Sequence, residues 1–184
     1  MNKFFGHLNT VLTHKKYVRQ YGKQLGLGFW ARNLHDISKF NPIEFFEGVK
    51  YWTGTSSPID ACKKECGYSK AWFHHRGRNK HHYEYWVDHL DDGGKPGLMP
   101  YRYSLEMLCD YLAAGKAYMG DKFTYEAEYK WWLAKKAKPL MMHEVQKQFI
   151  AKCLSFAAEY NYLPSARTVE NIFYTELAKY SKEK

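Results

Sequence analysis

The chain has 184 residues, of which 45% are hydrophobic and 18% aromatic, and its formal net charge is +9. This composition predicts one folded domain over residues 1–184 with a substantial core, and it excludes general disorder. No run of about 18 uncharged apolar residues occurs, so we expect no membrane span. The N-terminal segment lacks the continuous apolar region of a signal peptide. Four cysteines are too few for a disulfide scaffold in a chain of this size, which favours a cytoplasmic setting.

The positive charge predicts an anionic partner. Phosphorylated small molecules, nucleic acid and anionic lipid all carry the required charge. Composition alone does not choose among them.

Apolar residues recur at helical spacing along nearly the whole chain, which predicts an all-α fold. We expect helices over residues 3–21, 27–40, 41–52, 58–75, 101–120, 124–137, 140–160 and 165–181. The segment DDGGKPGLMP, residues 91–100, is the clearest loop because it holds three glycines and two prolines.

Several of these helices begin with recognisable start signals. Asn41 can cap a helix, Pro42 suits its first turn, and Glu44 completes a capping pattern three residues after the cap. Ser57 with the following proline repeats the signal, and Ser165 caps the last helix. These signals place the helix boundaries but say nothing about chemistry.

The second helix, in the segment 27–40, ends in His35 and Asp36. A neutral imidazole and a carboxylate side by side can bind one divalent cation. The pair alone is weak evidence, because it is several times more typical of a capped helix end with a satisfied histidine. Two other residues favour the metal: His14 lies upstream on an amphipathic helix, and Asp110 interrupts an apolar stripe, where a carboxylate is costly to bury unless it is paired or bound to metal.

The segment HHRGRNKHHYEYW places four histidines and three cations within a few residues of one another. The histidines are His74, His75, His81 and His82, and the cations are Arg76, Arg78 and Lys80. On a continuous helix, residues two turns apart share a face, which would pair either His75 with His82 or His74 with His81. The segment could bind metal, bind phosphate, or form a solvated basic face.

The segments HKKYV, LHDISKF, HHRGRNKHHYEYW, MPYRYSLEMLCDYLAAGKAY and LMMHEV resemble a family of phage and bacterial proteins, domain-of-unknown-function family 5662. That family is similar to a divergent, HDxxK-type branch of the HD-domain superfamily. The resemblance covers about residues 10–150 and leaves 151–184 as a C-terminal helical extension. It implies a single-domain, HD-like helical bundle that binds a divalent metal and usually hydrolyses phosphoesters.

The resemblance also implies a role for individual residues. The implied ligands of a first metal are His14, His35, Asp36 and Asp110. A second metal would be bridged by Asp36 and held by histidines from His74, His75, His81 and His82. We expect one or two divalent ions per chain, with zinc, manganese, iron, nickel and magnesium as the options.

The resemblance therefore implies a metal-dependent phosphohydrolase, which we expect to use a metal-activated water on a nucleotide or related phosphorylated small molecule. Asp36 and Lys39 are its expected catalytic residues. The expected phosphate-binding residues are Lys39, Arg76, Arg78, Lys80 and Lys116. Two alternatives stay open: a di-iron oxygenase on the same skeleton, and a non-enzymatic basic protein that binds nucleic acid. We expect His89 and His143 to have structural roles.

Overall fold

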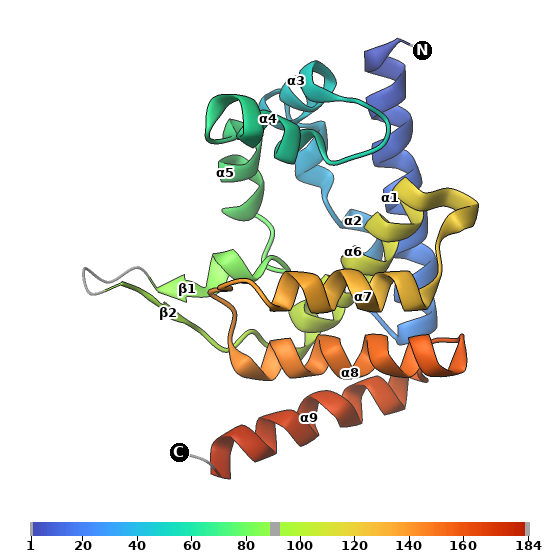
Figure 1. Ribbon diagram of the computed structural model, residues 1–184, viewed down its shortest axis with the longest axis vertical. Coiled ribbons are helices and arrows are strands. Elements are labelled where there is room, and N and C mark those ends of the chain that lie inside the picture. Colours follow the sequence, from blue (N-terminus) through green and yellow to red (C-terminus); the bar gives the residue numbers. More distant parts are fainter. Residues whose placement is uncertain (1, 89–92, 183–184) are drawn as a thin grey trace.

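In residues 2–88 and 93–182, which the computed structural model describes, nine α-helices carry most of the chain (Figure 1). They are α1 (Lys3–Leu25), α2 (Phe29–Leu34), α3 (Pro42–Tyr51), α4 (Pro58–Cys66), α5 (Lys70–Arg76), α6 (Tyr101–Met119), α7 (Tyr125–Lys136), α8 (Glu144–Tyr160) and α9 (Ala166–Lys182). Short 3-10 segments lie between them at η1 (Ile37–Phe40), η2 (Tyr83–Trp86) and η3 (Gly120–Lys122). The prediction of an all-α fold is confirmed. None of the described helices combines the length and the apolar character that crossing a bilayer requires.

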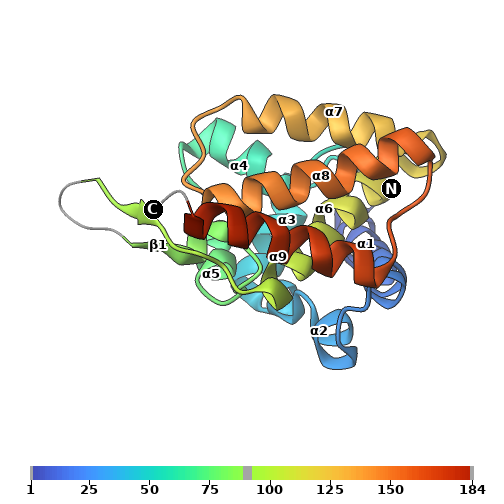
Figure 2. The same ribbon diagram turned by 90° about the horizontal axis from the view of Figure 1, so that it is seen from below.

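The helices form two groups that meet at α1 and α6. Helices α7, α8 and α9 are stacked on one side, in the lower half of Figure 1, and α9 is nearest the viewer in Figure 2. Helices α3, α4 and α5 pack together at the other end (Figure 1). Helix α1 packs along α6 and contacts α2 and α3, so it joins the two groups.

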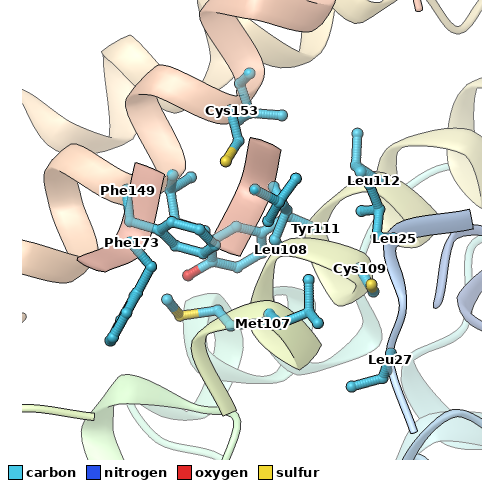
Figure 3. Packing of buried hydrophobic residues seen from close by; sticks show 14 of the residues in the cluster. Leu25, Leu27, Met107, Leu108, Cys109, Tyr111, Leu112, Phe149, Cys153 and Phe173 are labelled. Atoms are coloured by element: carbon cyan, nitrogen blue, oxygen red, sulfur yellow. The ribbon is translucent and has the colours of Figure 1, made fainter. Parts of the chain in front are cut away.

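Helix α6 is the centre of the core, because every residue from Ser104 to Ala113 is buried. Its apolar side chains, such as Leu108, pack with Phe149 of α8 and Phe173 of α9 (Figure 3). The same buried stretch also holds two carboxylates, Glu106 and Asp110. Since they are one helical turn apart, they lie on one face of α6.

The prediction of one helix over 27–40 is wrong, because the α-helix ends at Leu34. Asp36 has a φ of 53°, in the left-handed region that an aspartate adopts more readily than most residues. The chain therefore turns sharply at His35 and Asp36 before the short 3-10 segment that contains Lys39. This turn directs both side chains of the pair toward the interior.

The predicted helix over 58–75 is also divided. Gly67, with a φ of 79°, ends α4 in a conformation that favours glycine. Ser69 then begins α5 by accepting a hydrogen bond from the backbone N–H of Trp72 at 2.9 Å. The predicted loop 91–100 contains a short strand, β2 (Lys95–Pro96), which pairs antiparallel with β1 (Val87–Asp88). Residues 91 and 92 of that loop, and His89, lie outside the described residues.

The predicted helix caps have different outcomes. Asn41 accepts a hydrogen bond from the N–H of Ile43 at 3.0 Å, as its start signal predicts. Ser165 likewise accepts one from the N–H of Thr168 at 3.1 Å. The side chain of Ser57, in contrast, makes no such bond to α4. His143 caps α8.

Glu128 on α7 is buried against Gly115 of α6, without a hydrogen bond or ion pair to the described residues. Burial raises the pKa of Glu128 to about 7. The folded state therefore holds this proton more tightly than the unfolded state, so stability falls as the pH rises from the ordinary value of 4.5 through 7.

We expect Glu128→Gln to match the wild type in free energy of unfolding near pH 4.5 and to exceed it above pH 7 by about 3 kcal/mol. Urea titrations between pH 4.5 and 8 measure this difference. Glu170→Gln, at an exposed position of α9, is the matched control and should show no such trend. A stability difference that does not change with pH would contradict the burial argument.

Candidate metal centre

Two groups of histidine and aspartate side chains converge in the interior and share one member, Asp36. The first group is His14, His35, Asp36 and Asp110, and the second is Asp36, His75, His81 and His82. Within each group, one donor atom from every residue lies within 4.8 Å of the others. All these residues are buried except His82, which is half-buried.

Four separate segments of the chain deliver these side chains. Helix α1 contributes His14, the turn after α2 contributes the His35–Asp36 pair, and α6 contributes Asp110. Helix α5 contributes His75 and ends one residue later, so the chain folds back before His81 and His82. Because these segments are far apart in sequence, only the packing of α1, α5 and α6 can form the centre.

Asn79 holds this return of the chain in place. Its side-chain amide donates hydrogen bonds to the backbone carbonyl of His75 and to Ser38 Oγ, each at 2.8 Å. The first bond ends α5, and the second ties the loop to η1. The expected helical pairing of the four histidines therefore does not apply to His81 and His82, which follow α5 in a turn.

The carboxylate of Asp36 has one oxygen facing each group. Asp36 Oδ2 lies 3.6 Å from His14 Nε2 and 3.4 Å from His35 Nε2. Asp36 Oδ1 lies 3.3 Å from the Nε2 atoms of both His75 and His81. A tetrahedral ion with bonds of about 2.0–2.1 Å separates its ligand atoms by roughly 3.3–3.4 Å. The spacing of these donors therefore matches the edges of a metal coordination shell.

The potential metal-binding atoms around Asp110 are spaced in the same way. Asp110 Oδ1 lies 3.1 Å from His14 Nε2 and 3.2 Å from His35 Nε2, and these two nitrogens are 3.3 Å apart. Nitrogen lone pairs that face each other at this distance require a proton or a cation between them. An ion at this point would satisfy all three side chains.

Several buried oxygen and nitrogen atoms that could bind a metal lack a well-aligned hydrogen bond to any described residue. They are both oxygens of Asp36, His81 Nε2 and His82 Nε2. Lys39 Nζ makes an ion pair with Asp36 Oδ2 at 2.6 Å. The atoms that remain without such a bond are Asp36 Oδ1 and the two histidine nitrogens. Buried polar atoms without partners are costly, and a bound cation would remove this cost. The donor set therefore fits a metal ion.

Two glutamates contact the histidine rings on the side opposite the metal-facing Nε2 atoms. The sequence did not predict this role for either glutamate. Glu106 Oε1 accepts hydrogen bonds from His35 Nδ1 at 2.9 Å and from His81 Nδ1 at 3.2 Å. Glu44 accepts one from His75 Nδ1 at 2.7 Å. A proton held on Nδ1 by a carboxylate leaves Nε2 free to bind metal, which is the usual arrangement around metal-binding histidines.

The electrostatics of the centre also favour added positive charge. Burial alone would lower the pKa of His35, but Asp36, Asp110 and Glu106 outweigh it and raise that pKa well above its ordinary value. Burial opposes ionisation of Asp36 too, yet His35, Lys39 and His75 hold its pKa well below the usual range. In the absence of an ion, protons on the histidines must balance the carboxylates. A divalent cation would replace these protons.

The model of one protein family matches residues 3–155, and its description is a family of unknown function, DUF5662. The chain belongs to the DUF5662 family. None of the curated proteins and none of the solved structures matches it. Both groups around Asp36 lie inside the matched segment, so the DUF5662 domain contains the complete centre. Helix α9 lies beyond the match.

The other predicted site residues differ in whether they belong to the metal centre or line the cavity next to it. His74 is outside both groups, and its Nδ1 donates to Glu44 at 2.5 Å. Lys39 lines a cavity of about 210 Å³ that is also lined by His14, His75 and Asp110.

The other four predicted phosphate-binding cations do not line this cavity. Arg76 lies over the ring of Phe73, and Lys80 lies near the ring of Tyr85. Arg78 and Lys116 each donate a hydrogen bond to a backbone carbonyl.

Glu106→Gln should weaken metal binding by roughly 10- to 100-fold, because a neutral amide at this position cannot accept from both imidazoles as strongly as a carboxylate. Competition with a chromophoric chelator measures the affinity. Glu159→Gln, at an exposed position of α8, provides the control. If Glu106→Gln binds metal as tightly as the wild type, the supporting role of Glu106 is wrong.

Proposed function

We propose that this DUF5662 protein is an HD-type, metal-dependent phosphohydrolase. The observation that carries the proposal is the placement of the Asp36 carboxylate, with one oxygen toward His14 and His35 and the other toward His75 and His81. Such an arrangement suits a carboxylate that bridges two cations. The turn that holds His35 and Asp36, within an all-α chain, supports the HD-type assignment.

The two groups around Asp36 would hold the metal. His14, His35, Asp36 and Asp110 would bind the first ion, and Asp36, His75, His81 and His82 the second. Imidazole and carboxylate donors suit zinc, manganese, iron or nickel better than magnesium, which prefers oxygen ligands. When bound, these ions supply Lewis acidity and lower the pKa of a coordinated water.

Lys39 would bind and orient the phosphoryl group. Its ammonium lies 2.6 Å from Asp36 Oδ2, and its side chain is 27% exposed, toward the cavity. Burial alone would lower the pKa of Lys39, but Asp36 and Asp110 outweigh it and raise that pKa, so Lys39 stays protonated. A fixed positive charge at this point can contact a phosphoryl oxygen while it keeps its contact with Asp36.

Elemental analysis of protein purified without added metal tests the proposal. We expect one to two divalent ions per wild-type chain and a clear loss in Asp110→Asn, which removes a negative ligand without changing the size of the side chain. Asp121→Asn, at an exposed position, is the matched control. Near-zero metal in all three proteins would remove the basis of the proposal.

Hydrolysis of a general phosphomonoester such as p-nitrophenyl phosphate tests the reaction itself. Lys39→Met should lower kcat/KM by at least about tenfold, because a charge-assisted contact to the phosphoryl group is lost. Metal content measured on the same sample shows whether the centre is intact.

A di-iron oxygenase is the second function that the site supports. Of the five predicted phosphate-binding cations, Lys39 alone lines the cavity. This low number of cations also suits a substrate that carries no phosphate. Iron as the resident metal, with oxygen consumption and no phosphoester turnover, would favour this alternative.

A further inference from the structure

The cavity of about 210 Å³ extends away from the metal centre, and it is lined by α1 and α6 together with residues of α3, α4 and α5. Along α1 it is lined from His14 back to His7, and along α6 from Asp110 forward to Ala117. A helix rises about 1.5 Å per residue, so the seven steps between the ends of each stretch span about 10 Å. The cavity is therefore a pocket about 10 Å long with the donor groups at one end.

The part of this pocket beyond the donors is mainly apolar. Its walls include Val11, Ile59, Trp72, Ala114 and Ala117. The two alanines lie one turn apart on α6, and their small side chains leave the space that larger residues would fill. An apolar wall of this kind binds the hydrocarbon part of a ligand, since burial of apolar surface is favourable.

Three acidic residues line the pocket, Asp110, Glu44 and Glu47, and all three are already engaged with the protein. Asp110 belongs to the metal centre. Glu44 binds histidines of the centre. Glu47 accepts hydrogen bonds from Ser69 Oγ and from the backbone N–H groups of Lys70 and Ala71. All three carboxylates therefore already have partners within the protein.

Positive charge in the pocket is confined to the end near the metal centre. Lys39 is the one lysine or arginine among the described residues that line it. His7, at the far end, is buried, and burial together with the charge of Lys39 lowers its pKa to about 4. A neutral His7 offers no charge to a second phosphate. The pocket is thus built for one anionic group, next to Lys39.

We propose, resting on the phosphohydrolase function above, that the substrate is a small phosphomonoester with an apolar alkyl or aryl body, and not a nucleotide. The phosphoryl group would lie at Lys39 and the body along Val11, Trp72 and Ala117. A cavity of about 150 Å³ accommodates benzene, while pockets for drug-sized ligands begin near 300 Å³. The volume here therefore suits a body of a few carbons, and most of a nucleoside would lie outside it.

The chemical step is a hydrolysis that consumes one water. A new P–O bond forms from the water oxygen, the ester P–O bond breaks, and the leaving alcohol takes a proton. The products are inorganic phosphate and an apolar alcohol or phenol.

Binding of alkylphosphonates, whose P–C bond is not hydrolysed, tests the ligand class without relying on turnover. Calorimetry with protein that carries its metal should show an affinity gain of about fourfold per methylene, so butylphosphonate binds on the order of 50-fold tighter than methylphosphonate. Adenosine monophosphate should bind more weakly than butylphosphonate. Affinity that is independent of chain length, or tighter binding of the nucleotide, overturns the proposal.

A cavity-filling variant tests whether this pocket is responsible. Ala117→Phe should reduce the butyl-to-methyl affinity ratio at least tenfold, since its ring occupies the space for the alkyl chain. Ala134→Phe, on the exposed side of α7 and away from the pocket, should keep the wild-type ratio. An unchanged ratio in a metal-containing Ala117→Phe protein overturns the proposal. If that variant does not fold, the wild-type alkylphosphonate series alone decides.

The two proposals can fail separately. Chain-length-dependent binding without hydrolysis of p-nitrophenyl phosphate or butyl phosphate would refute the phosphohydrolase function and retain the ligand class. Hydrolysis with no dependence of binding on chain length would retain the function and refute the ligand class.

Discussion

The burial of the Asp36 carboxylate is the constraint on which the rest of the structure depends. Asp36 is 1% exposed, and an uncompensated charge at such a site would cost several kcal/mol. Part of its compensation comes from Lys39, three residues along the chain. The rest comes from His14, His35, His75 and His81, which belong to separate segments of the chain. The charge is therefore fully compensated only when these segments are packed together. A cation in each group would turn this costly arrangement into a binding site.

The supporting glutamates connect the centre to both helical groups. Glu106 comes from α6 and binds one histidine of each metal group, His35 and His81, while Glu44 comes from α3 and holds His75. Since α6 also forms the apolar core with α8 and α9, its rotation fixes Glu106 and Asp110 at the same time. Packing of the core thus determines the positions of the metal-binding side chains. The same face of α6 continues along the cavity of about 210 Å³.

The sequence predicted the all-α fold and most helices because helical periodicity is a local property. It also pointed to Asp110, since a carboxylate within an apolar stripe is conspicuous. Glu44 was misassigned to a capping pattern, and Glu106 was missed because an acidic residue on an amphipathic helix usually faces solvent. Which of the clustered histidines face Asp36 depends on where α5 ends. It ends at Arg76, and hydrophobic periodicity does not predict that end.

Anomalous X-ray diffraction from crystals of the metal-containing protein tests the central claim most directly. A bridging role for Asp36 predicts two peaks, one near His14 and Asp110 and the other near His75 and His81, separated by about 3.5–4 Å. A peak on one side of Asp36 alone would contradict the bridging role. The absence of any peak next to this carboxylate, with metal found elsewhere in the molecule, would contradict the metal centre as a whole.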